Sequence, residues 1–279
     1  MKKWFINYKQ YMLTLFTAWS FFSGCQILFE NFGKPNGLDQ KYPLFLLTIS
    51  LILIYLLPMI FVIRYLVKHF KISKSLINLS WLLGVTASIY FSEIGHTIVG
   101  LFWLKVVNPS DVFLSNWGAA VSAPFAEEFG KGLVVLLVLL ITKEVDLKSA
   151  LVSGLIVGLS FQIVEDCVYT FRDMFIEKLD GFVGIIERVV QAGGTHWAFS
   201  ILFAIGMVSL IFKNTGMSKK QGVFWLSMSI LEHFIFNTPF NGGIGSKSAN
   251  ITVFLLCLNF CLALAAFKTV NMIETNKTG

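Results

Sequence analysis

Charged residues are scarce in this sequence. Only 14% of its 279 residues are Asp, Glu, Lys or Arg, whereas 56% are hydrophobic. A soluble domain carries about 25% charge. The composition therefore excludes an ordinary soluble domain and predicts an all-α polytopic membrane protein. The net charge of +6 does not point to nucleic acid as a partner, because the basic residues form no patch.

Cysteine is also rare, and other common signals are missing. The four cysteines lie in apolar segments without CxxC spacing, so we expect buried thiols. No internal repeat and no separate soluble domain are evident. The first apolar run is long and lacks a small-residue cleavage site, which predicts an uncleaved first span. Residues 1–279 therefore read as a single integral membrane domain.

Long apolar runs make up most of the chain. A helix needs about 20 apolar residues to cross the hydrocarbon core. Eight runs meet this requirement: 11–29, 43–66, 79–104, 118–142, 149–171, 191–212, 221–240 and 250–270. Pro35-Asn36-Gly37 and Asn241-Gly242-Gly243 indicate turns between runs. We expect about eight transmembrane helices.

Lysine and arginine predict the orientation of these spans. With the N-terminus inside, the cytoplasmic loops collect roughly twice as many basic residues as the outer loops. Both termini are therefore expected in the cytoplasm. The 172–190 connection alternates apolar and charged residues at near-helical spacing. It predicts either an amphipathic helix on the outer face that gates access, or an ordinary loop helix.

Two glutamates and a lysine interrupt the fourth run. A carboxylate inside a bilayer costs about 2.5–3.5 kcal/mol on insertion scales, so the pair requires a reason. Glu127 and Lys131 lie four residues apart and are expected to form a helical ion pair. Glu128 is left without an obvious partner. Ser122 and Pro124 are expected to cap and begin the regular helix.

Other polar residues fall at a similar depth. At 1.5 Å per residue, Glu127 and Glu128, Glu165, His196 and His233 all lie about 8–10 Å from the outer helix ends. Independent structural residues have no cause to share a depth. We therefore expect these four helices to form a cavity in the outer half of the bilayer.

The chemistry available to such a group is hydrolysis. A desolvated glutamate can act as a general base on water. Two neutral imidazoles can position that water, stabilise an oxyanion or bind a metal. A glutamate and two histidines also meet the ligand demand of a catalytic zinc site. The HExxH pattern is absent, so glutamate-dependent and metal-dependent mechanisms both remain open.

Four further acidic or histidine residues lie near these positions. Glu93 and His96 are three residues apart in the third run, and we expect a structural pair, with a place in the site as the alternative. Asp166 and Glu232 neighbour the site residues but face away, so they are expected to be packing or rim groups.

The motifs resemble those of the PrsW family of intramembrane proteases. Glu127-Glu128-Phe-Gly-Lys131 matches an EExxK motif, and Phe161 to Glu165 matches FxxxE. Arg188 followed by Gly194-Thr195-His196 is similar to the next motif, and His233 to Asn237 to the last, HxxxN. The resemblance covers residues 120 to 240. The family is related to the CAAX prenyl protease and CPBP superfamily.

The resemblance implies a set of roles. The catalytic residues are Glu127, Glu128, His196 and His233, and the supporting residues are Lys131, Phe161, Glu165, Arg188 and Asn237. A metal, if present, is expected to be Zn²⁺ held by Glu128, His196 and His233, with Glu165 as a further candidate ligand. Ser200 stands where the family more often has an acidic or amide residue, so no role is assigned to it.

The resemblance also implies a location and a substrate. Residues 118–240 form a four-helix catalytic core, flanked by transmembrane helices in 1–117 and 241–279. The protein is expected in a bacterial plasma membrane as a multi-pass intramembrane endopeptidase. Its substrate is a membrane-anchored protein or peptide, of the anti-sigma-factor kind or the bacteriocin or lipopeptide kind.

Two other functions remain as alternatives. Buried Glu, His and Lys also serve ion- or proton-coupled transporters, although the polar group stays in one leaflet and no repeat pairs the two halves. A non-catalytic scaffold that keeps a degenerate site is the third possibility.

Overall fold

The computed structural model of the chain describes residues 2–33, 39–191, 195–243 and 246–278. The described residues are helical almost throughout and contain no strand, which confirms the all-α prediction. The first half contains α1 (Lys2–Phe32), η1 (Asp39–Lys41), α2 (Tyr42–Ile49), η2 (Ser50–Ile52), α3 (Leu53–Phe70), α4 (Lys74–Val85), α5 (Ala87–Phe102) and η3 (Trp103–Val107). The second contains α6 (Asp111–Thr142), α7 (Leu147–Phe171), η4 (Arg172–Ile176), α8 (Gly181–Gln191), α9 (His196–Ile211), α10 (Lys219–Phe236) and α11 (Ala249–Thr278).

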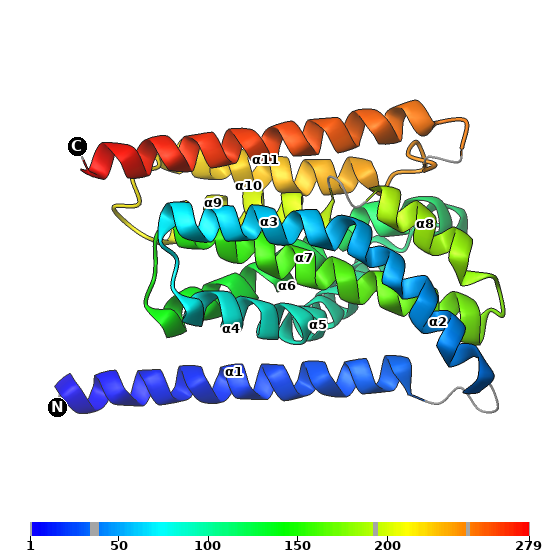
Figure 1. Cartoon of the computed structure of the whole chain (residues 1–279), viewed down its shortest axis with the longest axis horizontal. Helices are drawn as coiled ribbons and strands as arrows, with labels where there is room; N and C mark the ends of the chain where they lie inside the picture. The colour runs from blue at the N-terminus through cyan, green and yellow to red at the C-terminus, as the bar shows by residue number, and fades with distance from the viewer. Residues whose placement is uncertain (1, 34–38, 192–194, 244–245, 279) are drawn as a thin grey trace.

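The long helices run side by side, with both chain ends at the same end of the bundle (Figure 1). Four helical stretches in the described residues are long and apolar enough to cross a membrane, or up to six if each of two bent pairs counts as one span. Each of the eight predicted runs is mostly helical over its described residues; the run 221–240 extends beyond α10, which ends at Phe236. Helices α6 and α10, which carry charged residues, are not among these stretches. The expected turn at residues 35–37 lies outside the described residues.

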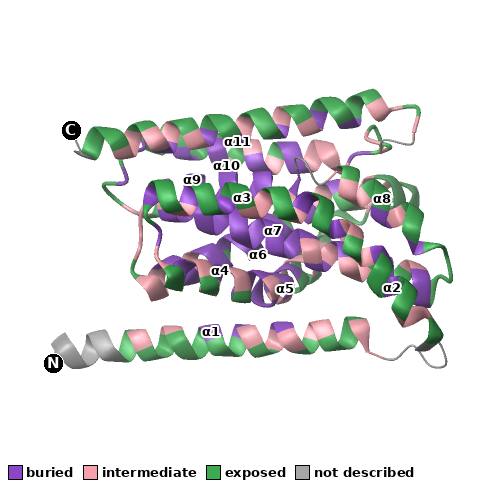
Figure 2. Cartoon of the chain, in the orientation of Figure 1, coloured by how far each residue is buried: buried purple, intermediate pink, exposed green. Residues whose placement is uncertain are grey.

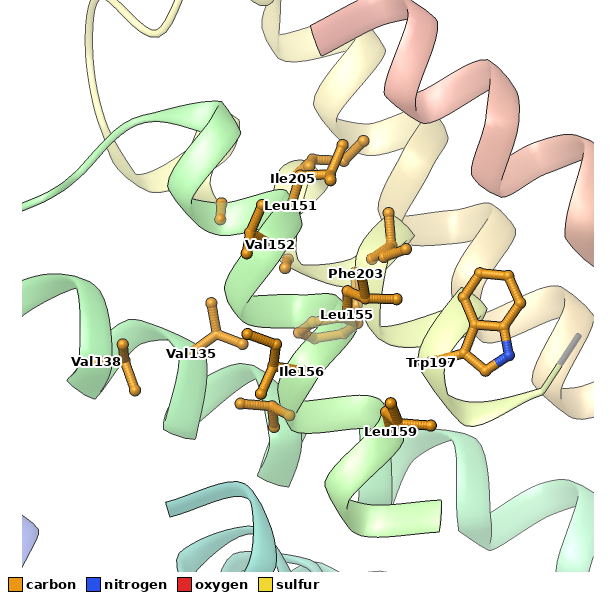
Figure 3. Packing of buried hydrophobic residues seen from close by; sticks show 14 of the residues in the cluster. Val135, Val138, Leu151, Val152, Leu155, Ile156, Leu159, Trp197, Phe203 and Ile205 are labelled. Carbon is orange, nitrogen blue, oxygen red and sulfur yellow. The ribbon is translucent and has the colours of Figure 1, made fainter. Parts of the chain in front are cut away.

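Helix α7 is the centre of the bundle. Of its most apolar stretch 89% is buried, against 17% for α1, which lies along one side (Figure 2). Leu155 and Leu159 of α7 pack with Val135 of α6 and Phe203 of α9 in the main apolar core (Figure 3). Because α7 touches both α6 and α9, it holds the helices that carry the candidate site at fixed separations.

The third predicted run is bent rather than straight. Helices α4 and α5 meet at Thr86 with an angle of 45°. The Thr86 hydroxyl donates to the Leu82 carbonyl, 2.8 Å away, and the Ser88 hydroxyl donates to the Gly84 carbonyl. Threonine and serine side chains that bond back to the preceding turn bend helices, which accounts for the break.

The predicted start of the fourth helix is wrong. Helix α6 begins at Asp111, where Ser110 caps it by accepting from the Phe113 amide at 3.2 Å. Pro124 lies inside this helix. Proline removes one backbone hydrogen bond, but the chain continues as helix through it. The glutamates therefore lie near the middle of α6 and not at the positive end of its dipole.

The connection at 172–190 contains a helix, as predicted, but a shorter one. Residues 172–176 extend α7 as a π-helix, and α8 begins at Gly181. The apolar face of α8 is divided: Ile185 is buried against the bundle, while Phe182, Val183 and Ile186 are exposed. Such a pattern is typical of a helix that lies at a membrane surface.

Candidate active site

Four helices bring their ionisable side chains together at one place. Glu127, Glu128 and Lys131 come from α6, Glu165 from α7, His196 from α9 and His233 from α10. His196 is the first residue of α9, and His233 lies in the last turn of α10. These helix ends lie at the end of the bundle opposite the chain termini (Figure 1).

Close helix packing places His196. A Cβ atom on Gly158 of α7 would lie 2.5 Å from the His196 carbonyl oxygen and 2.8 Å from Ser200 Oγ. Only glycine leaves room for α9 at this distance. The first turn of α9 therefore rests directly on the α7 backbone, one to two turns before Glu165.

Glu127 faces both imidazoles. Its Oε2 atom lies 3.6 Å from His196 Nδ1 and 3.8 Å from His233 Nε2. This oxygen is buried and accepts no hydrogen bond from the described residues. Buried polar atoms are nearly always paired, and Lys131 Nζ, at 3.7 Å, lies beyond hydrogen-bond distance, so the oxygen can still accept a further partner.

Each imidazole also contacts a second carboxylate, through the ring nitrogen that does not face Glu127. His196 Nε2 lies 2.8 Å from Glu165 Oε2, and His233 Nδ1 lies 3.0 Å from Glu128 Oε1. With a proton on each of these outer nitrogens, His196 Nδ1 and His233 Nε2 present lone pairs toward Glu127. Carboxylates in this position fix the tautomer of a metal-binding histidine.

Glu128 has a near partner, contrary to the sequence expectation. Lys131 Nζ lies 2.6 Å from Glu128 Oε1 and 3.7 Å from Glu127 Oε2. The predicted ion pair of Glu127 with Lys131 is therefore formed, and Lys131 pairs more closely with Glu128. Glu128 also contacts His233 Nδ1 and Ser200 Oγ, the latter at 3.2 Å. The departure from the family pattern at Ser200 thus supplies a hydrogen-bond donor to Glu128.

Lys131 also contacts the other elements of the site. Its Nζ lies 3.1 Å from His196 Nδ1 and 4.4 Å from the centre of the Phe161 ring. Phe161 in turn packs against the His196 ring, with centroids 5.2 Å apart. Both predicted supporting residues therefore line the inner wall of the site.

Arg188 of α8 bridges two carboxylates of α7. It donates to Glu165 Oε2 at 2.7 Å and to Asp166 Oδ1 at 2.5 Å. Asp166, expected to be a packing or rim group, is buried and also accepts from the Tyr55 hydroxyl at 2.8 Å. No motif of the sequence pointed to Tyr55, which lies on α3, more than 100 residues away.

The predicted pair between Glu93 and His96 is not formed. His96 Nε2 lies 3.4 Å from Glu127 Oε1, so this histidine belongs to the site. Glu93 is exposed on α5. Glu232 is buried beside His233, and its Oε2 has no hydrogen-bond partner among the described residues. The expectation of a packing or rim role for Glu232 stays a prediction.

A cavity of about 420 Å³ gives access to the site. Its lining includes His196, His233 and Glu165, together with Arg188, Asn237 and Asn241. The cavity is large enough for several residues of an extended peptide. Asn237, the last residue of the HxxxN motif, ends α10 and faces the cavity together with His233. Gly194 of the neighbouring motif lies outside the described residues.

The donor atoms fit a divalent metal. One oxygen of Glu127 and one nitrogen each of His196 and His233 all lie within 4.8 Å of one another. In a tetrahedral zinc site with bonds of about 2.1 Å, ligand atoms are about 3.4 Å apart, close to the two measured separations from Glu127. The orphaned Glu127 oxygen and the two carboxylate-backed imidazoles are further features of such a site.

A helical bundle that encloses carboxylates and imidazoles beside a cavity has the residue types that an intramembrane hydrolase requires. The chain belongs to the PrsW family: the model of that family, described as PrsW family intramembrane metalloprotease, matches residues 73–265, more than half of the chain. No curated protein and no solved structure matches it. The family expectation is thereby confirmed, and the protein is a multi-pass membrane protein of a protease family. Transport is not favoured.

Proposed function

We propose that the protein is an intramembrane endopeptidase that cleaves a membrane-anchored protein or peptide with water activated between Glu127, His196 and His233. The observation that carries this proposal is the buried Glu127 Oε2, which accepts no hydrogen bond from the described residues and lies 3.6 Å and 3.8 Å from the two imidazoles. Three electron-rich atoms converge there, and Lys131 Nζ places a positive charge beside them, 3.1 Å from His196 Nδ1 and 3.7 Å from Glu127 Oε2. A metal ion or a positioned water among the three atoms would complete the arrangement.

The residues divide into ligands and supports. Glu127, His196 and His233 would hold a Zn²⁺ ion, which supplies a Lewis acid and lowers the pKa of bound water. The sequence favoured Glu128 as a metal ligand. In this proposal Glu128 instead orients His233 and forms an ion pair with Lys131. Glu165 orients His196 in the same way. Glu127, Glu128, His196 and His233 all remain essential in this proposal, with different tasks.

The cavity suggests how a substrate meets this centre. A segment of the substrate would enter between α8 and the end of α10, where the amide side chain of Asn237 can pair with peptide groups. The expected substrates, of the anti-sigma-factor or the bacteriocin or lipopeptide kind, carry such a segment beside a membrane anchor. The proposal includes that this chain is related to the CAAX prenyl protease and CPBP superfamily.

The placement in the membrane is proposed as well. Both chain ends lie at one end of the bundle (Figure 1), which suits an even number of spans. Eight spans in a bacterial plasma membrane, with both termini in the cytoplasm, put the site toward the outer face. Residues 118–240 form the catalytic core, and 1–117 and 241–279 flank it, all within one membrane domain.

Two measurements on purified protein test the function. The first is metal content by mass spectrometry, and the second is cleavage of a panel of tagged single-span reporter proteins reconstituted in the same liposomes. We expect bound zinc and cleavage in the wild type. Glu127→Gln and His196→Ala should lower cleavage at least about 100-fold, in the range lost with a catalytic acid or base, and should release the metal.

Glu232→Gln is the matched control, since this buried carboxylate is adjacent to His233 yet its Oε2 has no hydrogen-bond partner among the described residues. It should cleave at close to the wild-type rate. Equal cleavage by wild type and Glu127→Gln would contradict the proposed function. Cleavage that survives complete chelation, but not Glu127→Gln, would replace the metal by a glutamate-activated water.

A further inference from the structure

Two of the three inner donors of the site have an outer support that fixes their direction. Glu165 Oε2 holds His196 at 2.8 Å, and Glu128 Oε1 holds His233 at 3.0 Å. Both supports lie on the helices that carry the family motifs. The third inner donor, Glu127, requires equal control, because a carboxylate that rotates about its last bond no longer aims one oxygen at the centre. Ligating carboxylates are themselves usually hydrogen-bonded.

The outer oxygen of Glu127 meets a residue from a different helix. His96 Nε2 of α5 lies 3.4 Å from Glu127 Oε1, while Oε2 of the same carboxylate points to His196 and His233. The two oxygens therefore have separate tasks. His96 belongs to none of the four motifs, and spacing alone paired it with Glu93.

The packing of α5 against α6 makes this contact a built feature. A Cβ atom on Gly95 would lie 2.7 Å from the Cα and the carbonyl oxygen of Ala126. Glycine at this position lets the two backbones touch directly beside the contact between His96 and Glu127. Side chains on neighbouring positions of two helices in backbone contact have little freedom to separate.

His96 is reached from a second cavity. A space of about 220 Å³ between α1, α5 and α7 is lined by residues that include His96, Phe161 and Glu165. About 40% of the His96 side chain is exposed, compared with 7% for Glu127. The imidazole is thus open to this cavity, whereas Glu127 does not line it.

We propose that His96 is a positioning residue: its Nε2–H group binds Glu127 Oε1 and keeps Oε2 directed at the two inner imidazoles. This inference rests on the proposed function, since it assigns His96 to the centre formed by Glu127, His196 and His233. His96 completes a ring of three supports around three inner donors. It touches neither the substrate cavity nor the reacting position.

The test is the zinc affinity of purified variants, measured by competition with a chromophoric chelator. His96→Asn should bind Zn²⁺ about 10–100-fold more weakly, the usual loss for a residue that orients a ligand, because its amide is too short to reach Glu127. His96→Gln should stay within about threefold of wild type, because its Nε2 amide replaces the imidazole Nε2–H. Reporter cleavage should follow the same order.

Thr97→Val is the matched control, since Thr97 is the next residue of α5 and its hydroxyl only donates to the Glu93 carbonyl. It should leave zinc affinity unchanged. Thermal unfolding of each variant separates a folding defect from a local one. Equal zinc affinity of His96→Asn and wild type would overturn the inference, as would an equal loss in His96→Gln and His96→Asn.

Failure of this inference differs from failure of the proposed function. If His96→Asn matches wild type while Glu127→Gln loses zinc and cleavage, only the role of His96 is wrong. If the wild type binds no zinc and Glu127→Gln cleaves normally, the proposed function itself is wrong, and the inference about His96 falls with it.

Discussion

Lys131 controls the charge balance of the site. Its side chain is 1% exposed, and its Nζ contacts Glu128, whose side chain is fully buried, at 2.6 Å. Removing one partner of a buried ion pair leaves the other charge uncompensated, which costs about 3–5 kcal/mol. At this depth a lysine is tolerated only because two carboxylates and an imidazole surround it.

Lys131→Met should therefore reduce the free energy of unfolding by about 3–5 kcal/mol, measured in detergent by denaturant or thermal unfolding. The control is Lys148→Met, since Lys148 forms a partly exposed pair with Glu274 at 3.7 Å. Its loss should cost less than about 1 kcal/mol. A similar cost for the two variants would show that Lys131 is not paired as described.

At the scale of elements, the contact between α7 and α9 sets the position of His196. The backbone of α9 lies so close to Gly158 that a single methyl group would meet the His196 carbonyl at 2.5 Å. The same contact brings the imidazole within reach of Glu165. The geometry of the site therefore depends on a residue without a side chain.

Gly158→Ala should push α9 away and cost about 1–3 kcal/mol, as overpacked cores do. It should also weaken zinc binding, because the start of α9 carries His196. Gly118→Ala in α6 is the control: a methyl group there would have no neighbour within 4 Å, and alanine favours helix by about 0.5–1 kcal/mol. Thermal unfolding and metal content check both variants, and unchanged zinc binding in Gly158→Ala would contradict the assigned contact.

Arg188 is the main polar link between α8 and the bundle. It pairs with Glu165 and with Asp166, so it joins the surface helix to the carboxylate that holds His196. Arg188→Gln should loosen α8, and amide hydrogen exchange in residues 181–191 should accelerate. Arg172→Gln removes only an exposed pair with Glu177 and should leave exchange in α8 unchanged. Equal protection of α8 in both variants would exclude this role.

At the scale of the whole molecule, the sequence predicted the helical class and the candidate residues better than their partners. Apolar runs and motif spacing pointed to α6, α7, α9 and α10, because helix periodicity is a local property. Which side chains pair with one another, in contrast, depends on residues that are distant in the sequence. Lys131 is within helical reach of both Glu127 and Glu128 and pairs with both, whereas Ser200 and His233, which also contact Glu128, come from other helices.

The start of α6 and the place of His96 show the same limit. Pro124 lies two residues after Ser122, a pattern typical of a helix start. Helix α6 runs through it because the preceding segment, from Asp111 onward, is itself helical and capped at Ser110. His96 reaches Glu127 only because α5 and α6 touch at Gly95. Such contacts depend on tertiary packing, which single-sequence patterns do not contain.

The charges in the middle of α6 bear on how the chain is made. Because it contains Glu127, Glu128 and Lys131, α6 is not among the helices that are apolar enough to span a membrane on their own. Helix α7, which the short segment 143–146 joins to α6, is among them. We expect the biosynthetic insertion machinery to release α6 and α7 into lipid as a hairpin. In a glycosylation-mapping assay α6 alone should fail to insert, and α6 fused to α7 should insert. Efficient insertion of α6 alone would show that its ion pair forms before α7 arrives.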